Sequence, residues 1–155
     1  MTSPQDDANV ELTFLLGIGF QLLLGEFAHR LDEAGYGDLR PVHGMAFQAL
    51  KGPGATATEL AERLGVTKQA AGQIVDDLEK RGYVRREPHP GGGRRRLVVL
   101  TDAATEHLAV AGRTLHALEA ELSAHTDIAA LRGELARLVR ALHPDGGLPP
   151  LRPVW

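Results

Sequence analysis

The sequence contains no cysteine, and this absence excludes several chemistries at once. Without a thiol there is no disulfide framework, no cysteine nucleophile, no thiol redox sensor and no cysteine-ligated zinc. Aromatic residues make up only 5% of the chain, and the formal net charge is -3, so an overall excess of positive charge is missing as well. Any contact with nucleic acid must therefore come from a local concentration of basic residues.

Long apolar runs are scarce. The most apolar stretch, residues 12–24 (LTFLLGIGFQLLL), is shorter than the roughly 20 residues that a membrane-spanning helix needs. The residues before it carry acidic side chains and no Lys or Arg, whereas a secretory signal starts with positive charge. We therefore expect a cytoplasmic protein with no membrane partner.

The common catalytic motifs are absent too. The sequence has no P-loop G-x-x-x-x-G-K-[ST], no nucleophile elbow G-x-S-x-G, no H-E-x-x-H and no C-x-x-C. We expect a protein that is not an enzyme and has no cofactor and no metal site. One alternative stays open, because His43 and His107 fall on two predicted helices and could meet as a metal or effector site.

Basic residues are concentrated in one segment. Between Lys68 and Arg96 there are eight basic and four acidic residues, a net charge of +4, which leaves -7 for the rest of the chain. Within it, residues 91–101 read GGGRRRLVVLT, three glycines followed by three arginines and a strand-like run. A local positive charge of this kind is typical of a surface that faces phosphate groups.

Leu and Ala dominate the composition, which predicts a mainly α fold. Residues 8–34 are predicted to form one long helix that is apolar on more than one face, and such a helix must be buried on most sides. In a chain of 155 residues this favours a partner chain, with burial inside one monomer as the alternative. Near the other end, helices are predicted over about 102–123 and from 126 or 127 to 142, followed by an irregular tail at 144–155.

The segment between these helices has clear start and stop signals. Pro41 suits the first turn of a helix that runs to about Leu50. Thr56 and Glu59 form a T-x-x-E capping box for a second helix that ends at Gly65. Thr67 caps a third helix that stops at Gly82. Strands at 83–86 and 96–101, with a tip rich in Gly and Pro, predict a β-hairpin.

Two short helices joined at a glycine turn are typical of a helix-turn-helix, whose second helix enters the major groove of DNA. The predicted outward face of that second helix carries Lys68, Gln69, Gly72, Gln73 and Asp76. Lys and Gln donate hydrogen bonds to base edges, and Gly allows close approach to the duplex. A solvated polar face is the simpler interpretation of these residues alone, and the basic hairpin beside them favours DNA.

Residues 58–101, TELAERLGVTKQAAGQIVDDLEKRGYVRREPHPGGGRRRLVVLT, resemble the winged-helix core of the MarR family of bacterial transcriptional regulators. The resemblance implies a mainly α, winged helix-turn-helix fold with a two-stranded β-hairpin wing and N- and C-terminal dimerisation helices. It implies one domain over residues 1–155. The parts of that domain would be dimerisation helices at 8–34 and 102–143, a DNA-binding lobe at 41–101 and the tail.

The same resemblance assigns the DNA contacts. It places Thr67, Lys68, Gln69, Gly72 and Gln73 on the recognition helix. Arg94 matches the wing arginine that enters the minor groove, and Arg95 and Arg96 would contact phosphates. Gly92 stands where the family has an Asp.

The implied function is sequence-specific regulation of transcription. The resemblance predicts a homodimer on a pseudo-palindromic, double-stranded DNA operator, repression of transcription, and release by a small aromatic effector. The candidate effector residues are Phe14, Phe20, His29, Tyr36, His43 and Met45. Two alternatives remain: a winged-helix module that binds proteins without DNA, and a metal-responsive regulator.

Overall fold

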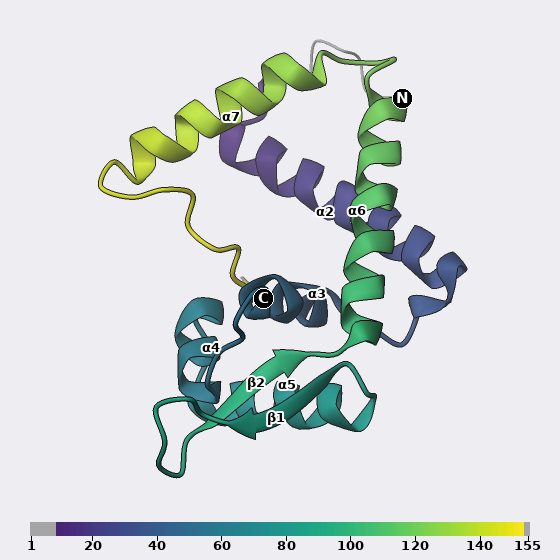
Figure 1. Cartoon of the computed structure of the whole chain (residues 1–155). Helices are drawn as coiled ribbons and strands as arrows, with labels where there is room; N and C mark the ends of the chain where they lie inside the picture. Colours follow the sequence, from purple (N-terminus) through teal and green to yellow (C-terminus); the bar gives the residue numbers. More distant parts are fainter. Residues whose placement is uncertain (1–8, 154–155) are drawn as a thin grey trace. The chain divides into compact units, whose positions relative to one another are not determined.

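The computed structural model of the chain describes residues 9–153. The chain forms two compact units, Met1–Asp38 and Leu39–Trp155. In the first unit, helix α2 (Leu12–Leu31) continues into a π-helical turn, η1 (Asp32–Tyr36), in which Gly35 has a φ of 97° (Figure 1). The predicted helix at 8–34 is therefore confirmed over most of its length, and its expected first residue lies outside the described residues.

The apolar side chains of α2 are largely uncovered within the chain. Six of them are between 44% and 70% exposed: Leu12, Phe14, Leu15, Ile18, Leu22 and Leu23. Together α2 and η1 form a helical stretch of 25 residues, Leu12–Tyr36, that is long and apolar enough to cross a membrane by length and composition alone. The sequence-based statement that this region is too short was wrong, because the helix continues past Leu24. The core helix of a soluble protein and a signal sequence pass the same test.

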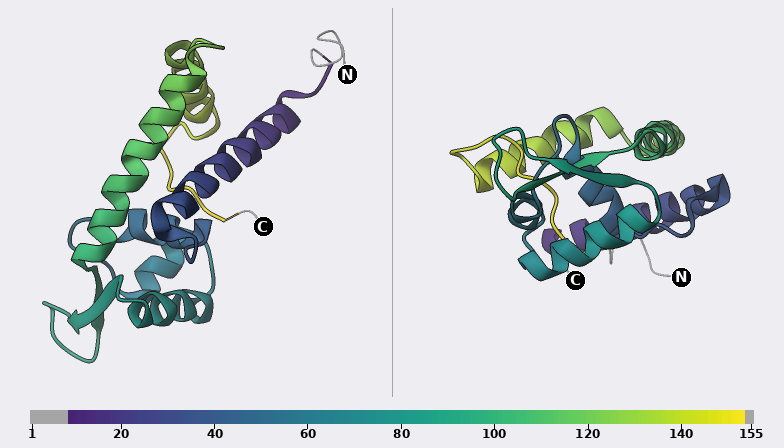
Figure 2. Two further views of the ribbon diagram at one scale, coloured as in Figure 1. Left: turned by 90° about the vertical axis from the view of Figure 1, so that its right-hand side faces the viewer. Right: turned by 60° about the horizontal axis from the view of Figure 1, so that its bottom comes forward.

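The second unit contains the winged helix-turn-helix. Its elements are α3 (Pro41–Leu50), α4 (Ala57–Leu64), α5 (Lys68–Lys80), β1 (Val84–Pro88), β2 (Arg96–Leu100), α6 (Asp102–Leu122) and α7 (Ile128–Leu142). The predicted order and fold class are confirmed. In Figures 1 and 2 the hairpin and α5 lie at one end of this unit, and α6 carries the chain away from them toward α7.

Local side-chain chemistry sets the ends of the short helices. The Thr56 hydroxyl accepts from the backbone N–H of Glu59 at 3.2 Å, and the Glu59 carboxylate accepts from that of Thr56 at 2.8 Å. Gly65 closes α4 with a φ of 67°, a left-handed conformation that favours glycine. The Thr67 hydroxyl then accepts from the N–H of Ala70 at 3.1 Å and starts α5. Each of these signals was readable in the sequence.

The strands β1 and β2 pair antiparallel, with Val84 opposite Leu100 and Pro88 opposite Arg96. Ala55 adds a further bridge to the hairpin, because its backbone exchanges hydrogen bonds with Val98 at 3.1 and 2.8 Å. The sequence analysis did not predict this bridge. The buried core below the hairpin contains Met45, Ala46, Phe47, Leu50, Ala55, Leu60, Leu64, Val75, Leu78, Val84, Val98 and Ala104.

The last helix, α7, buries none of its residues within the chain. Asp127 caps it, as predicted, by accepting from the N–H of Ala130 at 2.9 Å. The predicted apolar stripe of α7 is partly open to solvent, with Leu131 47% and Leu142 78% exposed. Residues 144–153 are irregular, in agreement with the sequence, and Trp155 lies outside the described residues.

Candidate nucleic-acid interface

The first half of α5 presents a polar face to solvent. Thr67, Lys68, Gln69 and Gln73 are exposed, and Gly72 between them is half-buried. The opposite side of the helix buries Ala71, Val75 and Leu78 in the core. Because the apolar side of α5 packs in the core, the opposite, polar side faces solvent. Its contact with DNA stays a prediction.

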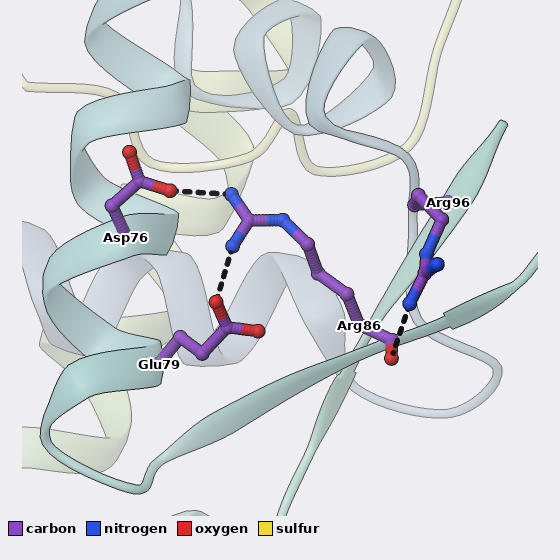
Figure 3. A network of polar contacts seen from close by, with 4 residues as sticks. All are labelled: Asp76, Glu79, Arg86 and Arg96. Carbon is purple, nitrogen blue, oxygen red and sulfur yellow. Dashed lines mark hydrogen bonds and ion pairs between the residues drawn. The ribbon is translucent and has the colours of Figure 1, made fainter. Parts of the chain in front are cut away.

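Asp76 lies on this open face, as predicted from the sequence, with its side chain 72% exposed, but its carboxylate is paired. Arg86 of β1 donates to Asp76 and to Glu79, each at 2.6 Å (Figure 3). Burial acts to lower the pKa of Arg86, but the hydrogen bonds and charges of the two acids outweigh it, and the pKa rises above its ordinary value. This permanently charged guanidinium joins the hairpin to the recognition helix. The Asp76 and Glu79 spacing places both acids on one helix face, a signal that the sequence analysis did not use.

The three consecutive arginines have different surroundings. Arg96 begins β2 and donates to the backbone carbonyl of Arg86 at 3.2 Å, across the hairpin (Figure 3). A Cβ atom on Gly91 would lie 2.6 Å from Nη2 of Arg95, so the absence of a side chain at Gly91 lets the Arg95 guanidinium fold against the wing loop. Arg94 is exposed at the tip. The Arg94 side chain is therefore the one that the hairpin engages least.

The wing tip is organised around His89, a residue that the sequence analysis did not single out. The His89 backbone N–H donates to the Arg95 carbonyl at 3.2 Å, and its carbonyl accepts from the Gly92 N–H at 2.9 Å. Its ring atom Nδ1 accepts from the Gly91 N–H at 2.9 Å. Gly92 and Gly93 both have positive φ, at 77° and 79°, which suits glycine at this turn. The loop thus has an internal hydrogen-bonded turn where the MarR family has an Asp.

The ion pairs of this region leave positive charge at the α5 start and the wing. All four acidic residues between Lys68 and Arg96 pair with arginines of the same segment: Asp77 with Arg81, Glu87 with Arg85, and Asp76 and Glu79 with Arg86. Within the described part of the chain, the five other basic residues have no acidic partner: Lys68, Lys80, Arg94, Arg95 and Arg96. Four of these five lie at the start of α5 or in the wing. Such a surface attracts phosphate groups.

The candidate effector residues divide between the two units. Phe14, Phe20, His29 and Tyr36 lie on α2 and η1, whereas His43 and Met45 are buried in the lobe. The set stays a prediction. An open cavity of about 580 Å³ lies in the lobe itself, between the α3–α4 loop, the outer face of the hairpin and α6, and none of the six residues lines it.

The two histidines of the metal alternative have separate neighbours. His43 Nε2 lies 3.0 Å from Asp77 Oδ2, whereas the His107 ring packs edge-on against Phe47 with 5.3 Å between ring centroids. Among residues 9–153, no group of three or more His, Asp or Glu side chains is arranged to hold a metal ion. The described structure therefore offers no ligand set that favours the metal alternative.

Comparison with known proteins finds a family match for part of this lobe. Residues 40–95 match the model of the MarR family. Over 53 residues the chain is 40% identical to YcgE of Bacillus subtilis (strain 168), described as an uncharacterized HTH-type transcriptional regulator, and the match spans 34% of each protein. The resemblance predicted from the sequence is confirmed for this segment, and the chain spans about a third of the curated relative that it matches.

Two solved structures share the fold at low sequence identity. The Staphylococcus aureus MepR–DNA complex has a TM-score of 0.68 at 16% identity, covering 88% of this chain and 99% of that one. CouR from Rhodococcus jostii RHA1, bound to p-coumaroyl-CoA, has a TM-score of 0.68 at 20% identity, covering 88% and 94%. At these identities the likeness establishes the fold.

Proposed function

We propose that this chain, which carries the winged helix-turn-helix of the MarR family at residues 40–95, is a cytoplasmic transcriptional regulator that binds double-stranded DNA sequence-specifically. One observation supports this most strongly. Every acidic side chain between Lys68 and Arg96 is paired internally, and the arginines of the wing and Lys68 at the start of α5 are left for phosphate. The fold shared with a regulator solved on DNA supports the same proposal.

We infer that the working form is a homodimer. The apolar side chains of α2 and α7 are exposed in the single chain, and exposed apolar patches of this kind mark protein interfaces. A second copy would cover them and would place two recognition helices on half-sites about one helical turn apart. A pseudo-palindromic operator follows from that symmetry.

We further propose repression that a small aromatic effector relieves. CouR, which shares the fold, was solved with p-coumaroyl-CoA, a ligand with an aromatic acyl group. For this chain the proposed effector residues remain Phe14, Phe20, His29, Tyr36, His43 and Met45. His43 and Met45 would act from inside the lobe, since both are buried.

The test is binding of the full chain to a fluorescent duplex from the DNA upstream of its own gene. We expect saturable binding that a scrambled duplex of the same composition does not compete away, and that weakens steeply with salt. The variant Arg94→Ala with Gln69→Ala serves as the matched control and should lose this preference. Equal binding to cognate and scrambled duplexes would contradict sequence-specific regulation. No binding to either would favour the protein-interaction alternative.

A further inference from the structure

His43 is a buried titratable side chain that connects the start of α3 to the recognition helix α5. Its ring is completely buried. Nδ1 lies 2.9 Å from the backbone nitrogen of Arg40, and Nε2 lies 3.0 Å from Oδ2 of Asp77 on α5. A backbone N–H only donates, so Nδ1 must be the unprotonated acceptor and the ring proton must sit on Nε2. Nε2 is close to the carboxylate but forms no aligned hydrogen bond with it, so their contact is electrostatic. The two contacts thus specify one neutral tautomer.

Asp77 completes a chain of contacts along α5. Its other oxygen, Oδ1, accepts from Nε of Arg81 at 3.0 Å. The hydrogen bond from Arg81 holds the pKa of Asp77 below its ordinary value, so the carboxylate is charged at neutral pH. The series Arg40, His43, Asp77, Arg81 therefore runs from the residue before α3 to the residue after α5. It begins two residues after the end of the first unit at Asp38.

A second ring proton would disturb this arrangement. It would have to occupy Nδ1, where it would face the Arg40 N–H that now donates to that atom. The groups that face the ring are Arg40 from the α3 start and Asp77 and Arg81 from α5. Burial lowers the pKa of His43 below its ordinary value, the two arginines act in the same direction, and Asp77 acts against them. The neutral ring is thus the form that fits the folded lobe near pH 7.

We propose that His43 is a positioning residue for DNA binding: its neutral ring holds α5 in register with the start of α3, and losing that state weakens binding. The inference rests on the proposed function. His43 touches no DNA in this proposal and acts through Asp77. Asp77 lies on the recognition helix, between the buried Val75 and Leu78.

The pH dependence follows from the direction of the pKa shift. Between the lowered pKa of folded His43 and the ordinary value near 6.5, the unfolded chain binds more protons than the folded chain. The stabilisation is complete above the ordinary value and is lost as the pH falls from there through the folded pKa. The ring of the folded chain gains its second proton only as the pH falls through its lowered pKa, so operator binding should weaken there.

The decisive variant is His43→Gln. A glutamine amide offers an oxygen to the Arg40 N–H and an N–H to Asp77, as the neutral ring does, and it does not titrate. Fluorescence anisotropy of the full chain with the upstream duplex is measured at constant ionic strength. We expect wild-type affinity to fall about fivefold from about pH 7.5 to pH 5.5, and His43→Gln to change less than about twofold. Near neutral pH the two should agree within about threefold.

His125→Gln is the matched control, because His125 is exposed between α6 and α7 and lies outside α3, α5 and the wing. It should keep the wild-type slope with pH. A His43→Gln protein that also keeps that slope would overturn the proposal. So would ¹⁵N NMR that finds the neutral His43 proton on Nδ1, whatever the DNA result. If the tautomer is as stated but the wild type binds no duplex at any pH, the proposed function fails and the positioning role fails with it.

Discussion

Single residues at the wing illustrate how position sets the role of identical side chains. Arg94, Arg95 and Arg96 are consecutive, yet Arg96 bonds to the Arg86 carbonyl and Arg95 folds over Gly91. Arg94 stands at the tip of the loop that His89 organises. A minor-groove contact requires a side chain that can leave the hairpin, and Arg94 satisfies that requirement best.

Arg94→Ala should weaken operator binding more than Arg95→Ala or Arg96→Ala. A narrow A·T-rich minor groove attracts arginine, so the loss at Arg94 should be largest on duplexes with A·T-rich flanks. Arg95 and Arg96, as phosphate contacts, should each lower the salt slope by about one unit on every duplex. Anisotropy at several salt concentrations measures both effects. Three equal losses without any dependence on the flanks would place Arg94 outside the groove.

Base reading should depend on the two exposed glutamines of α5. Gln69→Ala and Gln73→Ala should each reduce discrimination between the operator and single-base variants by about 1–3 kcal/mol, because one bidentate contact is lost. Competition with a panel of point-substituted duplexes provides the measurement. Gln48→Ala, exposed on α3, is the control and should leave the discrimination unchanged.

At the scale of elements, the hairpin and α5 are joined by side chains as well as by the core. Arg86 on β1 holds two carboxylates of α5, and Arg96 on β2 holds the backbone at Arg86. This arrangement links the wing to the recognition helix and pairs two exposed carboxylates of α5 with a positive charge. Arg86, whose side chain is partly buried, therefore helps to fix the orientation of the wing relative to α5.

Arg86→Ala should weaken DNA binding more than it weakens the fold. The pair is partly exposed, so its loss should lower the free energy of unfolding by roughly 1 kcal/mol. The freed Asp76 and Glu79 carboxylates would then repel phosphate, and binding should fall at least about tenfold. Urea unfolding and anisotropy separate the two effects. Arg85→Ala, which breaks only the exposed pair with Glu87, is the control, and equal binding losses would contradict the role of Arg86.

At the scale of the whole molecule, the exposed apolar side chains of α2 and α7 favour a dimer formed with a second copy of the chain. Leu22 of α2 is 70% exposed, and Leu138 of α7 is half-buried on a helix with no buried residue. A single folded chain gains little from Leu22, since most of that side chain is in water. A dimer would remove them from water and add about 25 cal/mol per Å² of apolar area.

Leu22→Asp and Leu138→Asp should each abolish the dimer, because a charge in a dry interface costs several kcal/mol. Sedimentation velocity at micromolar concentration reports the change directly. Because Leu22 is exposed and Leu138 belongs to a helix with no fully buried residue, circular dichroism should show that the variants keep their helices. A variant that sediments as a dimer would remove its helix from the proposed interface.

The sequence by itself determined the elements and their order. The capping residues Thr56, Glu59 and Thr67, the turn at Gly65 and the alternating strands act through neighbours a few residues away, so their effect can be read locally. The same local reasoning located the polar face of α5 and the basic wing, which are the larger part of the candidate site.

Only the tertiary structure decided which polar residues hold that site together. Arg86 meets Asp76 from ten residues away, and His43 meets Asp77 from another helix altogether. The sequence placed Asp76 on the outward face of α5 and His43 in a candidate effector set, but composition and spacing did not identify the partner of either side chain. The strength of an ion pair or a buried hydrogen bond depends on distance and burial in space, and the folding of distant segments onto one another sets both.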